Sequence, residues 1–488
     1  TANTSGTRNT AVGYAALAAN TTQPDNTALG HHALTTNTAG GNTAIGSGAL
    51  QLTTTGQTNT AVGPYALQNN TVGGGDNAFG YFALRGNISG THNNAFGNNA
   101  LYANTTGSNN VAMGGSALAA ATTPSGQTAI GYQALASTTT GENNTAVGFR
   151  SLWQNTTGSQ NTALGVTALT SNTTGSSNQA FGYQALYNST TGTDNIALGS
   201  LALTANVGGQ YNVAIGSSAL AAATAQSGQV AVGYQALNVA TSASGNTAIG
   251  HQVLKATTTG TWNTAVGYQA LTGNTTGYGN SAVGNLALWS NSSGYYNNAL
   301  GYYALNANTT GYYNNAVGNG ALQTTTTGHS NNAFGNNALG FNLNGVSNSA
   351  FGNNAMQSNT SGSNNAALGA LAMQSNTTGQ NNVGIGAVAL LALNSGSDNT
   401  ALGRGSLSSV TSGTGNLGLG YSVGSTVLTT GSNNILIGTS NAVTTPAAGT
   451  SNWLNIGNTV YGDTSTTQVA IGSGIAAMTT GIVFDLGS

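Results

Sequence analysis

The 488-residue chain is almost uncharged: Lys and Arg number five, Asp and Glu number seven, and together they make 2% of the residues, against roughly 25% in ordinary soluble domains. A net charge of −2 lacks the positive surface that nucleic-acid binding requires. With four prolines and no cysteine beside 74 glycines, collagen-like chains and disulfide-stapled small domains are excluded. No apolar run approaches the ~20 residues of a membrane span, so we expect no membrane insertion.

From residue 9 to about residue 424 the chain repeats one unit of 17 residues, N-T-A-V-G-Y-x-A-L-x-x-N-T-T-G-x-x. Aligned on the glycine that follows Asn-Thr-Ala-Val, here called the key glycine, the 25 copies run from Gly13 to Gly420, with one step of 16 between Gly30 and Gly46. Gly, Asn and Thr at this density are poor helix formers. Short apolar stretches such as Thr10-Ala11-Val12, bounded by Asn-Thr-Thr-Gly turns, predict very short strands.

A strand this short is stable only when it pairs with its equivalent in the next copy. The sequence therefore predicts an all-β fold, a repetitive β-solenoid or β-roll of about 25 turns covering residues 1–424. At about 4.8 Å per turn we expect a shaft roughly 120 Å long. After Gly420 the spacing becomes irregular, with key glycines at Gly438, Gly457 and Gly472. We expect residues 425–488 to form an irregular C-terminal β cap.

Two columns of large apolar residues are predicted to form the core. The residue before the key glycine is always apolar, as in Val12 and Leu29, and the residue four places after it is Leu or Met in 24 of 25 copies, as in Leu17. The first two positions after the key glycine vary widely, so we expect them to face solvent.

Two further columns carry inferences about hydrogen bonding and assembly. Asn stands four residues before the key glycine in 22 copies, the exceptions being Asp76, Gln127 and Gln229, which predicts an internal ladder of stacked side-chain amides.

Ala and Gly flank the apolar strand residue almost without exception, and such uniform smallness favours close approach by another chain. The alternative is a single-chain solenoid with a tight Ala-Gly interior.

The units Asn263–Leu271 and Asn274–Gly277 resemble the repeats of bacteriophage tail-fibre-like proteins, and they are similar to those of trimeric autotransporter adhesin heads. The segment Asn452–Asp463 is similar to the stretch that precedes a self-cleaving intramolecular chaperone in tail-fibre-like proteins. The resemblance implies a parallel homotrimeric fibre that reaches to a surface, in which an end at Ser488 fits the product left after chaperone removal.

Catalytic, metal and cofactor sites are not expected, because the seven acids and five histidines are scattered along the chain. The Asn-x-Ser/Thr sequences at Asn20, Asn104, Asn155 and Asn274 recur at the repeat period, so we interpret them as turn chemistry and not as glycosylation sites. An aromatic strip is the one candidate binding site, for a glycan, although stacked tyrosines can equally stabilise neighbouring turns. Its residues are Trp262, Tyr278, Tyr295, Tyr296, Tyr312 and Tyr313.

These observations favour a non-enzymatic, homotrimeric fibre shaft that is extracellular, on a cell surface or a virion, and attaches to a surface receptor or glycan as a phage tail fibre or an adhesin filament. A self-associating matrix or sheath filament is the alternative. An ice- or mineral-binding array is a third reading, which the irregular solvent-facing columns disfavour.

Overall fold

The computed structural model describes residues 3–465, 468–471 and 482–485. The chain divides into two compact units, Thr1–Gly245 and Asn246–Ser488, each of which is described by itself. The described residues of both units contain β-strands and turns and no helix.

The first unit is built from three-residue strands joined by arcs of 13 or 14 residues. These strands are β1 (Thr10–Val12), β2 (Thr27–Leu29), β3 (Thr43–Ile45), β4 (Thr60–Val62), β5 (Asn77–Phe79), β6 (Asn94–Phe96), β7 (Val111–Met113), β8 (Thr128–Ile130), β9 (Thr145–Val147), β10 (Thr162–Leu164), β11 (Gln179–Phe181), β12 (Ile196–Leu198), β13 (Val213–Ile215) and β14 (Val230–Val232).

The second unit continues this pattern and then lengthens its strands. It contains β15 (Thr247–Ile249), β16 (Thr264–Val266), β17 (Ser281–Val283), β18 (Asn298–Leu300), β19 (Asn315–Val317), β20 (Asn332–Phe334), β21 (Ser349–Phe351), β22 (Ala366–Leu368), β23 (Val383–Ile385), β24 (Thr400–Leu402), β25 (Leu417–Leu419), β26 (Ile435–Ile437), β27 (Trp453–Ile456), β28 (Val460–Asp463), β29 (Gln468–Ile471) and β30 (Ile482–Asp485).

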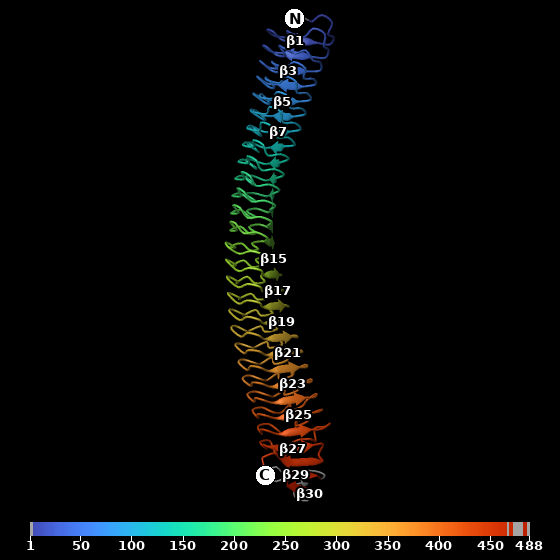
Figure 1. Cartoon of the computed structure of the whole chain (residues 1–488), viewed down its shortest axis with the longest axis vertical. Coiled ribbons are helices and arrows are strands. Elements are labelled where there is room, and N and C mark those ends of the chain that lie inside the picture. The colour runs from blue at the N-terminus through green and yellow to red at the C-terminus, as the bar shows by residue number, and fades with distance from the viewer. Residues whose placement is uncertain (1–2, 466–467, 472–481, 486–488) are drawn as a thin grey trace. The chain divides into compact units, whose positions relative to one another are not determined.

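Up to β27, successive strands within each unit stack in sequence order (Figure 1) and pair in parallel at a register of one repeat. In the first unit Ala11 pairs with Ala28, and in the second Ala265 pairs with Ala282. One repeat is therefore one turn, and the predicted β-solenoid is confirmed, with its short strands paired in parallel. From β27 onward the pairing becomes antiparallel, through β28 and β29 to β30.

The arcs bring the chain back through left-handed backbone conformations. The key glycine Gly30 has a φ of 144°, and a Cβ there would lie 2.5 Å from the carbonyl oxygen of Gly46 in the next turn. The buried Leu34 has a φ of 53°, a region that costs a non-glycine residue free energy. In this conformation the Leu34 N–H donates to the carbonyl oxygen of Ala49, 3.1 Å away in the next turn. Hydrogen bonds between turns thus hold the arcs as well as the strands.

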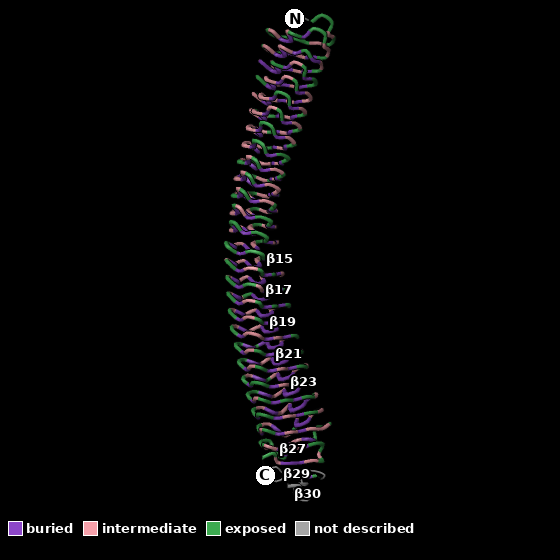
Figure 2. The backbone as a smooth tube through the Cα atoms, in the orientation of Figure 1, coloured by how far each residue is buried: buried purple, intermediate pink, exposed green. Residues whose placement is uncertain are grey.

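In most turns the apolar part of the interior consists of two alanines and one leucine. Figure 2 shows buried and exposed residues alternating around the turns. In the second turn Ala28, Ala33 and Leu34 are fully buried. The expected core position of the Leu/Met column is confirmed.

The expected core position of the other apolar column is wrong. Leu29 is 46% exposed and Leu300 is 52% exposed, because the strand directs its central alanine inward and its flanking side chains outward. The Ala column therefore faces the coil's own interior and does not receive another chain. The leucine that enters from the arc fills the space, so the strand can contribute only a methyl group. For this face the tight single-chain interior is the arrangement observed.

The asparagine ladder is confirmed. The Asn59 N–H donates to Asn42 Oδ1 in the preceding turn over 2.9 Å. The Asn59 side-chain amide in turn donates to the carbonyl oxygen of Gly73, also over 2.9 Å. All the ladder positions from Asn26 to Asn434 are buried, so each side chain satisfies polar backbone groups that the interior would otherwise leave unpaired.

A second ladder, not expected from the sequence, is formed by the asparagines of the Asn-Thr-Thr-Gly turns. Asn172 Nδ2 donates to Asn155 Oδ1 at 2.8 Å, and Asn155 Nδ2 donates to the Gly158 carbonyl oxygen at 2.9 Å. The turn motif that is typical of exposed loops here places its first residue inside the coil.

The main ladder ends in the second unit at an aromatic residue. Trp453 stands at the next ladder position, and its backbone N–H donates to Asn434 Oδ1 over 2.8 Å. The Trp453 ring, 9% exposed, lies 6.0 Å from the ring of Tyr461 on β28. An apolar side chain thus replaces the amide where the parallel pairing gives way to antiparallel pairing.

Candidate interaction surfaces

Among the described side chains, charged residues lie far apart along the stack, with one close pair. Arg8 and Asp25 form an exposed ion pair, in which Arg8 Nη2 donates to Asp25 Oδ2 over 2.7 Å. Their hydrogen bond raises the pKa of Arg8 and lowers the pKa of Asp25. In the described ranges no three residues among His, Cys, Asp and Glu lie close enough to hold a metal ion.

Asp76 is the one acid in the buried asparagine ladder. Its Oδ1 accepts the Asn93 N–H at 2.8 Å and its Oδ2 accepts a proton of Asn87 Nδ2 at 3.1 Å. Burial outweighs these hydrogen bonds and raises the pKa of the carboxyl to about 7. The site is enclosed by the coil, so we interpret Asp76 as a structural substitution within the ladder.

The candidate glycosylation sequences have no accessible acceptor nitrogen. Asn20, Asn104, Asn155 and Asn274 are fully buried. Each donates its side-chain amide to the carbonyl oxygen three residues later, as Asn155 does to Gly158 over 2.9 Å. Their interpretation as turn chemistry is confirmed.

The aromatic strip lies on the arcs of the second unit, and the structure brings five of its six predicted residues together. Tyr278, Tyr295 and Tyr312 stack with centroids 5.1 and 4.9 Å apart, and Tyr296 stacks on Tyr313 at 5.5 Å. Edge contacts join the two columns.

The two ends of the strip lie at other residues than predicted. His329 extends the first column, with its ring 4.4 Å from that of Tyr312; its place 17 residues after Tyr312 was the available signal. Trp262 is 69% exposed, but Gly279 stands between it and Tyr296 in the second column.

The stacking determines what the strip can offer a ligand. Both faces of the Tyr295 ring are covered by nearly parallel neighbours, whose centroids lie 5.1 and 4.9 Å away. Desolvation, followed by the neighbouring tyrosines, raises the pKa of its hydroxyl. A sugar stacks on a ring face, so it meets only edges and hydroxyl groups along the middle of the column.

An exposed apolar feature that recurs in both units is the column of strand residues that precede the key glycines, here called the apolar column. In the first unit it comprises Val12, Leu29, Ile45, Val62, Phe79, Phe96, Met113, Ile130, Val147, Leu164, Phe181, Leu198, Ile215 and Val232. In the second unit it comprises Ile249, Val266, Val283, Leu300, Val317, Phe334, Phe351, Leu368, Ile385, Leu402, Leu419, Ile437 and Ile456.

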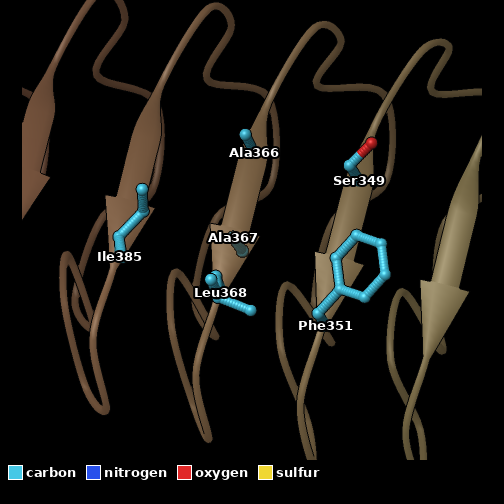
Figure 3. A pocket seen from close by; sticks show the side chains of 6 residues that line it. All are labelled: Ser349, Phe351, Ala366, Ala367, Leu368 and Ile385. Carbon is cyan, nitrogen blue, oxygen red and sulfur yellow. The ribbon is translucent and has the colours of Figure 1, made fainter.

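Neighbouring members of the apolar column contact each other along the stack. Phe79 stacks on Phe96 with centroids 4.8 Å apart, and Phe334 stacks on Phe351 at 4.9 Å. Differences in side-chain size leave hollows in the surface. One of about 390 Å³ lies between Phe351 and Ile385, over Leu368 and the small side chain of Ala366 (Figure 3).

No protein-family model matches the sequence, and a search of curated proteins found no match. In the described residues no helix is sufficiently long and apolar to span a bilayer.

Proposed function

We propose that this chain is the shaft of an extracellular fibre that attaches to a surface, as a phage tail fibre or a cell-surface adhesin filament, and that it is non-enzymatic and works as a homotrimer. The observation that carries the proposal is the use of neutral hydrogen bonds between every described pair of successive turns within each unit. A stack held by backbone bonds and amide ladders is insensitive to salt, in contrast to one held by ion pairs.

The resemblance of the Asn-Thr-Ala-Val-Gly-Tyr-Gln-Ala-Leu unit to tail-fibre and adhesin repeats supports the same function. An alternative, the self-associating matrix or sheath filament, uses the same fold and differs in growing end to end. The ice- or mineral-binding array is less favoured. The outward strand position that carries threonine in β1 to β4 carries asparagine in β5, glutamine in β11 and isoleucine in β12, so it presents no uniform threonine lattice.

The attachment function is tested by measuring the binding of fluorescently labelled chain to intact bacterial cells. An amine-reactive dye couples to Lys255, the single lysine of the chain, and to the terminal amine. We expect saturable binding to some strains that excess unlabelled chain displaces. Electron microscopy of the same sample distinguishes the alternative, because particles of one finite length support the shaft and indefinite filaments support the matrix polymer. Absence of displaceable binding to any strain in a broad panel overturns the attachment function.

A separate experiment tests whether the aromatic strip contacts a glycan. Because stacking covers its ring faces, we expect the double variant Tyr295→Ala, Tyr312→Ala to adhere normally to a glycan-coated surface while its turns exchange amide protons faster. Adhesion reduced to background, with exchange unchanged, would instead assign glycan binding to the strip. The control is Tyr302→Ala, another exposed tyrosine of the same unit.

A further inference from the structure

We propose that copies of this chain pack against one another, parallel and in register, through the apolar column. The parallel direction rests on the proposed function, because a shaft that attaches at one end needs its copies to point the same way. The sequence had favoured the Ala-Gly face as the contact between chains. The strand alanines of that face are buried inside the coil, so we assign the contact to the apolar column.

The first argument is the extent of the exposed surface. Members of the column include Leu164 at 46%, Leu198 at 47% and Leu368 at 51% exposure. At roughly 60–70 Å² for each side chain, the column exposes roughly 900 Å² of apolar surface in each unit, comparable to the ~800 Å² that each partner buries in a standard interface. Monomeric soluble proteins rarely leave a contiguous apolar patch of this size in water.

The second argument is electrostatic. The two outward positions of every strand from β1 to β27 carry no charged residue. Association through this face therefore desolvates no ion, a step that otherwise costs several kcal/mol for each charge. The polar groups at the other outward strand position are neutral, and some pair along the stack already, as Asn298 Nδ2 does with Asn315 Oδ1 over 2.7 Å.

The third argument identifies the occupant. A partner that covers the column along a whole unit must present apolar groups at the same interval, about 4.8 Å, which is the spacing of paired strands. A second copy of this chain does so at every turn. Rotational symmetry about an axis parallel to the stack then places identical turns level with each other.

Local relief supports side-chain insertion between copies. In Figure 3 Phe351, Leu368 and Ile385 stand on one side of strands β21, β22 and β23, whereas Ala367 lies on the opposite side of its strand. The hollow over Leu368, lined by Ser349 and Ala366 as well, can receive a side chain of a neighbouring copy. Packing of this kind reaches the density of a protein interior.

The absence of native cysteine gives a direct test. In the single variant Leu164→Cys, treatment with a short bismaleimide is expected to give a cross-linked pair of chains, because identical residues lie level across the interface. The matched control is Val166→Cys, two residues away in the same turn and equally exposed at 46%, which is expected to remain uncrosslinked. Cross-linking at Cys substituted for Val166 and not for Leu164 overturns the proposal.

A second variant measures the consequence for assembly. Leu164→Asp combined with Leu198→Asp is expected to reduce the native mass to that of one chain, with an unchanged circular dichroism spectrum because both side chains lie outside the coil. The control Val166→Asp combined with Ser200→Asp, in the same two turns, is expected to keep the wild-type mass.

The outcomes separate this proposal from the proposed function. A multimer that survives both aspartates in the apolar column contradicts the interface and leaves the fibre intact. Cross-linking through Leu164→Cys without displaceable binding to cells contradicts attachment and leaves the interface intact. A wild-type chain that is monomeric, or that sediments only with lipid vesicles, overturns the packing of copies.

Discussion

Replacing Asp76 by Asn is expected to stabilise the first unit and to remove a dependence of stability on pH. At the equivalent position one turn earlier, Asn59 donates its amide to a glycine carbonyl oxygen over 2.9 Å; an ionised carboxylate has no proton to donate. Asp76→Asn restores that donor and removes a buried charge. Both changes favour the folded ladder.

The size and sign follow from the pKa of Asp76, which burial raises from 3.8 to about 7. Between these values the folded chain binds more protons than the unfolded chain, so stability is greatest below pH 4 and falls as pH rises through 7. Three pKa units correspond to about 4 kcal/mol, lost in full only above pH 7.

Local stability is measured by hydrogen exchange and mass spectrometry, because turns of a repeat protein open separately. At pH 8 we expect peptides spanning residues 60–94 to be protected up to about a thousand-fold more in Asp76→Asn than in the wild type. At pH 4 the two proteins are expected to agree, and peptides from 145–179 serve as the internal reference. Equal protection at pH 8, or wild-type protection that rises with pH relative to the reference, would refute the reasoning.

Three further predictions concern packing. Leu186→Ala, inside the coil, is expected to cost about 2–5 kcal/mol in free energy of unfolding, whereas Leu198→Ala on the outward face costs less than about 1 kcal/mol in dilute, dissociated chain; equal losses in denaturant titrations would contradict the assignment of faces. Gly165→Ala, whose Cβ would lie 2.4 Å from a carbonyl oxygen of the next turn, is expected to disrupt its turn. Gly457→Ala has nothing within 4 Å and costs only about 1–2 kcal/mol, for a side chain at a φ of 60°; the order of their thermal midpoints checks this. Asn172→Asp is expected to be more destabilising than Asn172→Thr at pH 7 and to recover in part at pH 4, and a pH-independent difference between the two melting temperatures would speak against the second ladder.

The repeat allowed much of the fold to be predicted from the sequence. A 17-residue period with strands too short to stand alone leaves parallel stacking as the solution, and the recurrent Asn column indicates the ladder that Asn42 and Asn59 form. The aromatic strip followed from the same arithmetic, since residues one period apart, such as Tyr295 and Tyr312, lie in neighbouring turns.

The facing of the strand could not be predicted in the same way. Alternation along a strand predicts that Ala28 and Leu29 lie on opposite faces, but it does not indicate which of the two faces is inside. Size alone favours Leu29, and that preference fails because Leu34 enters the interior from the arc. The second ladder was obscured for a related reason, because Asn in Asn-Thr-Thr-Gly is equally typical of an exposed turn.

The native mass of the wild-type chain tests the central claim most directly, because a solenoid with an uncovered apolar column should not remain alone in water. Native mass spectrometry at low micromolar concentration is expected to give three times the chain mass of 47.9 kDa. A particle of 47.9 kDa that persists as the concentration is raised would contradict the account.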